Sequence, residues 1–225
     1  MYRVGQEQSQ KEYVTVSLVG DKLFKGIIFD SGSDIIVLFN GEDFIYIPVS
    51  HIEYIVADTP DAAFVEPSNF SSTLSNHLQK ELSLDSILKE AKGIYQELCI
   101  INKKSLHGTI LDVLDDYIVF YSPIYKKIYI AKRHIKWLIP YMPNERPYDL
   151  SEAELKCQQT EKECENYFAQ QIAKLTNKLV VLNLSEKIHH IGKIKNINDK
   201  MLELQTVRAK SVHVNIAHIQ TIHEV

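Results

Sequence analysis

The 225-residue chain contains little cysteine and no long hydrophobic run. Its 3 cysteines, Cys99, Cys157 and Cys164, form no CxxC pair, which excludes a small disulfide-stapled fold and agrees with a reducing compartment. No apolar stretch approaches the roughly 20 residues of a membrane-spanning helix. The first ten residues also lack the apolar core of a secretory signal. We therefore expect synthesis inside the cell and no membrane partner.

Neither sign of charge dominates the chain, because 25 Lys and Arg residues stand against 29 Asp and Glu residues, a formal net charge of -4. Hydrophobic residues make up 45% and charged residues 24% of the sequence. These values exclude a disordered tail, a collagen-like chain and a polybasic nucleic-acid arm. A globular chain of this length buries roughly 70% of the surface that its unfolded form exposes, so we expect a sizeable core.

One pattern occurs three times, at residues 13–55, 95–138 and 175–222. Each copy has an apolar segment, a polar turn, a glycine inside a second apolar segment, an acidic or Asn-containing turn, and a closing His-Ile pair before a last apolar segment. The glycine and the histidine are separated by 25 or 26 residues in every copy. The equivalent positions are Gly26 and His51, Gly108 and His134, and Gly192 and His218. We call these copies the first, second and third repeat.

Side chains in each repeat alternate with a period of two, and β-branched and aromatic residues are frequent. This pattern predicts four to five short strands in each repeat. A flat sheet of so few strands leaves its edges exposed, and closure into a small barrel removes them. The repeated glycine fits a strand that bends sharply across a core, and a histidine that recurs in all three repeats is better suited to holding a turn than to catalysis. We therefore expect a mainly β protein with helices (α+β), made of three tandem Sm/SH3-like five-stranded barrels.

Amphipathic helices are predicted before the second and third barrels. Apolar residues recur at helical spacing within 72–92, and the segment 150–174 begins with Ser151 and Glu154 in the arrangement of a capping box. The expected organisation has a first barrel, a linker, and two units that each combine a helix with a barrel. Their limits are 1–58, 59–71, 72–142 and 143–225.

The chain offers few residues for catalysis or metal binding. Histidines gather in the third repeat, which leaves a metal site there open, but strand geometry places His213, His218 and His223 on alternating faces unless a turn intervenes. The cysteines lack a neighbouring catalytic signature. We expect no enzymatic activity, no cofactor and no bound metal. The histidines of the third repeat are His189, His190, His213, His218 and His223.

Charge is distributed unevenly along the chain. Residues 12–58 carry 2 basic and 8 acidic side chains, a net charge of -6. Residues 93–141 and 175–225 each carry 7 basic and 4 acidic side chains, a net charge of +3. This asymmetry suggests complementarity between repeats or head to tail between molecules, although solvated faces are the simpler interpretation.

Basic and aromatic residues alternate at the end of the second repeat, which makes this segment a candidate interaction surface. Single-stranded nucleic acids are bound by platforms of this kind, so an Sm-like RNA-binding or regulatory protein is the alternative function. The negative net charge and the lack of the same pattern in the other repeats disfavour nucleic acid as a partner. The candidate residues are Lys126, Lys127, Lys132, Arg133 and Trp137.

The threefold pattern resembles the N-terminal region of the bacillus spore coat protein B family. The segments that carry the resemblance, besides the repeated glycines and His-Ile pairs, are 45–47, 116–119 and 128–130. The Ser/Lys/Arg-rich tail of that family's outer coat member is absent after Val225, so no role of such a tail is carried over.

The members of that family are structural proteins, so the resemblance implies no catalytic residues in this chain. We therefore expect a non-enzymatic structural or assembly protein of the spore coat type, deposited in the spore coat. Its expected partners are other coat or assembly proteins, and a homo-oligomer is a further expectation.

Overall fold

The computed structural model describes residues 12–60, 64, 74, 82–100, 104–142, 145, 147–150, 163–185, 187, 190–198 and 200–225. The chain divides into two compact units, residues 1–84 and 85–225. The described residues form fifteen strands, which pair antiparallel within each of the two units. No helix in this part of the chain has the length and apolar composition to cross a bilayer.

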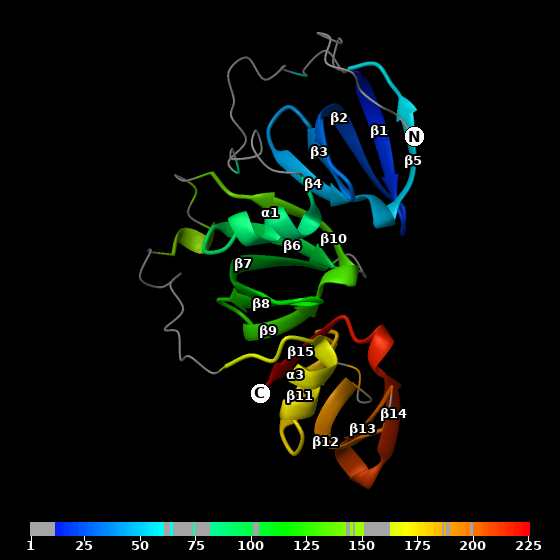
Figure 1. Cartoon of the computed structure of the whole chain (residues 1–225), viewed down its shortest axis with the longest axis vertical. Coiled ribbons are helices and arrows are strands. Elements are labelled where there is room, and N and C mark those ends of the chain that lie inside the picture. Colours follow the sequence, from blue (N-terminus) through cyan, green and yellow to red (C-terminus); the bar gives the residue numbers. More distant parts are fainter. Residues whose placement is uncertain are drawn as a thin grey trace. The chain divides into compact units, whose positions relative to one another are not determined.

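The first unit contains a five-stranded sheet in the order β5-β1-β2-β3-β4 (Figure 1). A one-turn 3-10 helix, Val49–His51, leads into the last strand. Strands β3 and β4 are buried along their whole length, as expected for β-branched and aromatic runs in a small core. The strands are β1 Tyr13–Leu18, β2 Lys22–Ser31, β3 Ile35–Phe39, β4 Phe44–Pro48 and β5 Ile52–Ala57.

The second unit contains ten strands in one sheet, in the order β14-β13-β12-β11-β15-β9-β8-β7-β6-β10. The second repeat supplies β6 Tyr95–Ile100, β7 Lys104–Val113, β8 Tyr117–Ser122, β9 Lys126–Ala131 and β10 Ile135–Pro140. The third repeat supplies β11 Leu179–Leu182, β12 Ile191–Asn198, β13 Met201–Gln205, β14 Ser211–Asn215 and β15 Thr221–Glu224. Each repeat thus has its last strand beside its first strand.

Two seven-residue α-helices are described, α1 Leu84–Glu90 and α3 Phe168–Lys174. They precede β6 and β11 and turn buried side chains such as Ile87, Phe168 and Ile172 inward. Short 3-10 helices at Lys132–His134, Pro147–Asp149, Val207–Ala209 and Ile216–His218 complete the unit. These α-helices cover part of the predicted segments 72–92 and 150–174. Most of the other residues of these segments, among them Ser151, Glu154 and Cys157, lie outside the described residues.

The prediction of three separate Sm/SH3-like barrels, the second and third each preceded by an amphipathic helix, is wrong. In the second unit, β9 of the second repeat pairs with β15 of the third repeat, so the two repeats share one continuous sheet. They also share one apolar core, which joins Tyr117 and Tyr129 to Phe168 and Ile222. Barrel closure was expected to remove the edges at β9 and β15, but pairing between the two repeats covers them instead. The predicted domain limits at 58, 71 and 142 stay predictions.

The second strand of every repeat lies very close to the next strand at its glycine. A Cβ atom on any of the three glycines would collide with a backbone carbonyl oxygen of the facing strand. A register shift follows a few residues later in each case, between Ile28 and Asp30, Ile110 and Asp112, and Ile194 and Asn196. Such bulges increase the local twist. The glycines are Gly26, Gly108 and Gly192, and the oxygens belong to Phe39, Tyr121 and Gln205.

Candidate functional site

The repeated histidines end three one-turn helices of nearly identical conformation. The residues before these turns, Pro48, Ala131 and Asn215, have φ values of -61°, -68° and -72° and ψ values of 129°, 125° and 123°. Each turn redirects the chain into the last strand of its repeat. The histidine side chains differ in environment, because His51 is buried, His134 is half-buried and His218 is exposed.

The basic and aromatic residues predicted to form a surface in the second repeat do not lie in one exposed patch. Trp137 is only 6% exposed. Lys126 is exposed and donates to the Pro123 carbonyl oxygen at 3.0 Å, while the Lys127 ammonium lies 5.5 Å from the centre of the Tyr129 ring. The structure therefore keeps Lys126 and Lys127 near the surface, whereas Trp137 contributes to the interior.

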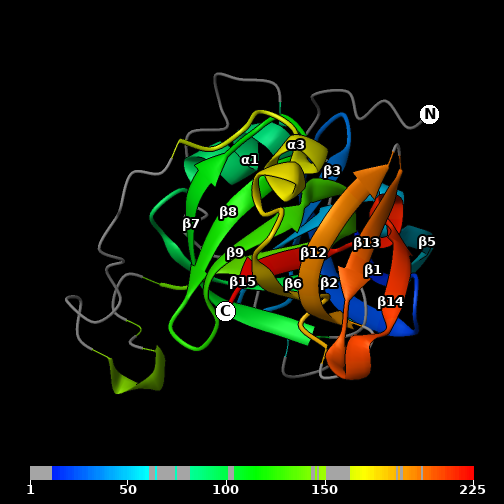
Figure 2. The ribbon, with the colours of Figure 1, turned by 90° about the horizontal axis from the view of Figure 1, so that it is seen from below.

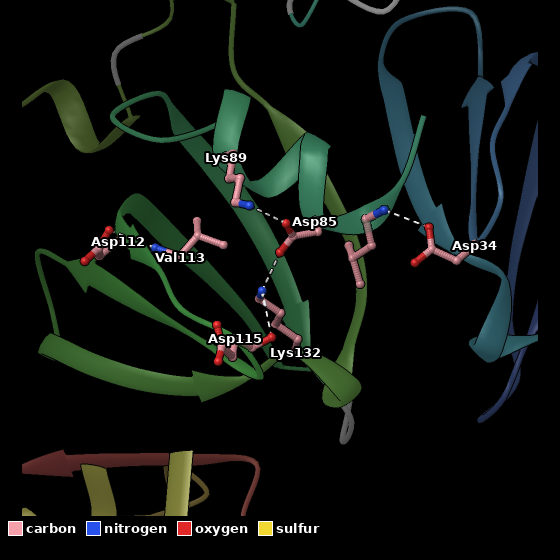
Figure 3. A network of polar contacts seen from close by, with 8 residues as sticks. Asp34, Asp85, Lys89, Asp112, Val113, Asp115 and Lys132 are labelled. Atoms are coloured by element: carbon pink, nitrogen blue, oxygen red, sulfur yellow. Dashed lines mark hydrogen bonds and ion pairs between the residues drawn. The ribbon is translucent and has the colours of Figure 1, made fainter. Parts of the chain in front are cut away.

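Lys132 belongs to an ion-pair network centred on Asp85 (Figure 3). Its Nζ lies 2.5 Å from one oxygen of Asp85, whose other oxygen lies 2.6 Å from Lys89 Nζ. Burial raises the pKa of the Asp85 carboxyl, but the hydrogen bonds from Lys132 and Lys89 outweigh it and leave that pKa below its usual value. Lys132 also donates to the Asp115 carbonyl oxygen at 3.1 Å. It thus ties α1 to the turn between β7 and β8.

Arg133 and His134 contact the third repeat at the end of β9. Arg133 Nη2 donates to the carbonyl oxygens of Ile216 and Ala217 at 3.1 and 3.0 Å. His134 Nε2 lies 3.3 Å from the same Ala217 oxygen. These two side chains therefore hold the turn that precedes β15.

The backbone continues this contact as a short antiparallel ladder, which we call the β9–β15 junction. Ile130 lies opposite Thr221, and Tyr129 lies opposite Ile222. The Ala131 amide donates to the Gln220 carbonyl oxygen at 3.0 Å. Thr221 and Ile222 are fully buried. β9 of the second repeat and β15 of the third repeat are therefore inner strands of the sheet that both repeats share.

A second contact between these repeats caps α3. Asp116, in the turn before β8, accepts a hydrogen bond from the Phe168 amide at 2.7 Å. The Tyr117 hydroxyl donates to the Glu165 carbonyl oxygen at 2.5 Å, and its ring lies 5.7 Å from that of Phe168. Burial raises the pKa of the Tyr117 phenol, which keeps it neutral. Within the first unit, Asp34 accepts in the same way from the Leu84 amide at 2.8 Å (Figure 3).

The residues considered for metal binding and nucleophilic chemistry are spread through the fold. The described part of the chain brings no three His, Cys, Asp or Glu side chains together in a metal-holding group. Cys99 is buried in β6 and Cys164 is partly buried beside α3, whereas His189 lies outside the described residues. His223 packs against Tyr125 with ring centres 6.2 Å apart, and burial lowers its pKa.

Sequence reasoning missed the exposed apolar strand β5. Tyr54, Ile55 and Val56 are 53%, 42% and 52% exposed, although their sequence is as apolar as that of the other closing strands. Among the described strands of the first unit, β5 pairs only with β1. In the second unit, β14 pairs only with β13 among the described strands, and it lies outermost in the sheet (Figures 1 and 2). The exposure of β5 and β14 depends on which strands pair with them. The composition of a strand does not show its pairing, so the sequence alone could not reveal these two edges.

Two comparisons with known proteins match this chain. A family model described as the YwrJ third domain matches residues 167–222, which cover α3 and nearly all of the third repeat. The protein YwrJ of Bacillus subtilis (strain 168) is 30% identical over 215 residues, which are 93% of this chain and 94% of YwrJ. An alignment of this identity that spans nearly the full length of both proteins establishes common descent, and the chain belongs to the YwrJ family.

Proposed function

We propose that this chain is a non-enzymatic assembly protein of the spore coat type, which acts through protein–protein contacts made by its repeats. The observation that carries the proposal is the β9–β15 junction, where the edge of one repeat accepts a strand of another repeat. Edge strands bind further strands through main-chain hydrogen bonds, and this mode suits building blocks of an ordered layer.

The polar side chains of the second repeat support this proposal, because they bind other segments of the chain. Lys132, Arg133 and Asp116 each bond to a carboxylate or to backbone groups that hold neighbouring segments together. The resemblance of the repeat pattern to the bacillus spore coat protein B family adds the cellular setting.

A fluorescent fusion of the full chain in a sporulating bacillus tests the proposal. We expect the signal to concentrate in a shell around the developing spore, whereas the fluorescent protein alone stays diffuse. A fusion that remains diffuse throughout sporulation contradicts the spore coat role.

Single-stranded RNA binding is the competing function, and filter binding separates it from assembly. Phosphate contacts impose a steep loss of affinity with salt. We expect no retention of RNA at 0.05 or 0.2 M salt, because Lys132 and Arg133 are committed to contacts within the chain. Salt-sensitive retention that disappears when Lys126 and Lys127 are replaced by Ala would favour RNA binding.

A further inference from the structure

We propose that β14 of one molecule pairs antiparallel with β5 of a second copy of this chain, so that molecules join head to tail. This inference rests on the proposed assembly function and specifies its partner and surface. It reproduces between molecules the β9–β15 junction that the second unit already contains.

The alignment of the repeats identifies β14 and β5 as the two halves of that junction. β14 occupies in the third repeat the place of β9 in the second, since each precedes the one-turn helix that ends at the repeated histidine. β5 occupies in the first repeat the place of β15, since each pairs with the first strand of its repeat. Within the described part of each unit, both strands have one unpaired side.

The side chains of β5 are those of an inner strand. Its Tyr54 and Ile55 are equivalent to Thr221 and Ile222 of β15, which are fully buried. Yet Tyr54 is 53% and Ile55 is 42% exposed. A cluster of apolar side chains on an open strand edge is typical of a protein-binding surface.

The backbone presents the hydrogen-bonding groups that such pairing needs. The Asp58 amide bonds to the Tyr13 carbonyl oxygen within the sheet, so strand alternation points the amide of Ile55 outward. The Ile216 amide bonds to the Lys200 carbonyl oxygen, so the amide of His213 also points outward. Neither strand contains a proline that would block an edge.

The register of the β9–β15 junction transfers directly to the new contact. It places Val214 opposite Tyr54 and His213 opposite Ile55. The same register brings Lys210, which follows the 3-10 helix before β14, opposite Asp58 at the end of β5. The opposite charges of the two repeats, -6 for residues 12–58 and +3 for residues 175–225, favour the same pairing.

The contact uses a different surface on each molecule and is therefore heterologous. Such contacts generate open filaments unless the rotation between molecules closes a ring. One element of the β9–β15 junction is missing, because the position equivalent to Arg133 is Ala217. Without the arginine that holds the facing turn, we expect association that is reversible and dependent on concentration.

Sedimentation velocity of the full chain, with variants that block one edge at a time, tests the proposal. His213→Pro and Ile55→Pro each remove one outward amide, and edge strands tolerate proline. His213→Ala and Ile55→Ala are the matched controls, since they keep the amide. We expect the wild-type sedimentation coefficient to rise with concentration, and each proline variant to associate about tenfold more weakly than its alanine control.

Mixing the two proline variants gives the decisive result. The His213→Pro variant retains β5 and the Ile55→Pro variant retains β14. At concentrations where neither variant associates alone, the mixture should therefore form a one-to-one complex that grows no further. A His213→Pro variant that self-associates as strongly as His213→Ala would show association that does not use β14, and would overturn the proposal. A wild-type chain that stays monomeric at all concentrations would also overturn it.

The variant Ala217→Arg keeps the test valid if a proline variant fails to fold. It restores the arginine of the β9–β15 junction at an exposed position, and we expect at least a severalfold gain in association. Unchanged association contradicts the proposed register. A chain that fails to self-associate but still forms a shell around the spore would refute this contact and leave the proposed function intact. Self-association without a shell would do the reverse.

Discussion

The repeated glycines allow neighbouring strands to lie closer together than any larger residue would permit. Replacing Gly108 by Ala would press a Cβ atom against the Tyr121 carbonyl oxygen and the Phe120 ring. Overpacking of this kind destabilises a core by about 1–3 kcal/mol. We expect Gly108→Ala to lower the free energy of unfolding by an amount at the upper end of that range, measured by urea denaturation.

Gly93 is the matched control for this substitution. A Cβ atom there meets nothing within 4 Å, but its φ of +79° lies in the left-handed region. Gly93→Ala should therefore cost only about 1 kcal/mol of conformational strain. Equal losses at the two positions would contradict the steric role of Gly108.

His223 should make the stability of the folded chain sensitive to mild acid. Burial lowers its pKa from the ordinary 6.5, so the folded state favours the neutral imidazole. As the pH falls below about 6.5, the unfolded chain takes up a proton that the folded chain resists, and the free energy of unfolding decreases.

We expect His223→Gln to flatten the dependence of unfolding free energy on pH below about 6.5. His213→Gln, on the exposed strand β14, controls for the loss of a surface histidine. Thermal unfolding at several pH values gives the comparison. Identical slopes for the wild type and His223→Gln would contradict the assignment.

The short helices depend on neighbouring elements for their caps. α3 has only seven residues, too few for a stable isolated helix, and its first amide is satisfied by Asp116 from the preceding repeat. Asp116→Ala should destabilise the second unit by about 1 kcal/mol, and Asp116→Asn should retain most of the stability. Hydrogen exchange in residues 168–174 would report the loss locally.

Asp115→Ala is the control for this prediction, because the Asp115 contacts with Asn166 and Lys132 involve its backbone. The prediction fails if the Asp115 and Asp116 variants lose protection in α3 equally.

Salt should weaken association of the whole molecule if the charge asymmetry contributes to it. The first repeat is acidic and the third is basic, and the Debye length shrinks from about 10 Å at 0.1 M to about 3 Å at 1 M salt. We expect the weight-average mass measured by sedimentation equilibrium to fall as salt rises over this range. Oligomers whose mass is independent of salt would remove the electrostatic contribution.

The elements of the fold differ in how well the sequence predicted them. The strands of the three repeats carry period-two alternation, and the positions of Gly108 and His134 mark equivalent points in the chain. The limits of the helices were predicted less well. The apolar spacing within 72–92 predicted a helix over that whole segment, whereas α1 spans Leu84–Glu90. Amphipathic spacing sets which face of a helix is buried, but caps supplied by distant residues such as Asp116 determine where it begins.

The candidate interaction surface was less accessible to sequence reasoning. Lys132, Arg133 and Trp137 are close together in the chain, but their side chains meet Asp85, the Ile216 carbonyl oxygen and the interior respectively. Basic and aromatic side chains alternate in both a binding platform and a strand that joins two repeats. The pattern cannot separate these cases, because the partner of each side chain lies far away in sequence.

The sequence by itself determined that one strand pattern occurs three times, with a glycine where the backbone coils and a histidine that ends a turn, because these features depend on local sterics and periodicity. Only the tertiary structure decided that the second and third repeats merge into one sheet. Whether an edge strand closes on its own repeat or pairs with a neighbour depends on the relative free energies of two arrangements with the same local pattern. That difference is set by contacts such as Arg133 with Ala217, between residues distant in the chain.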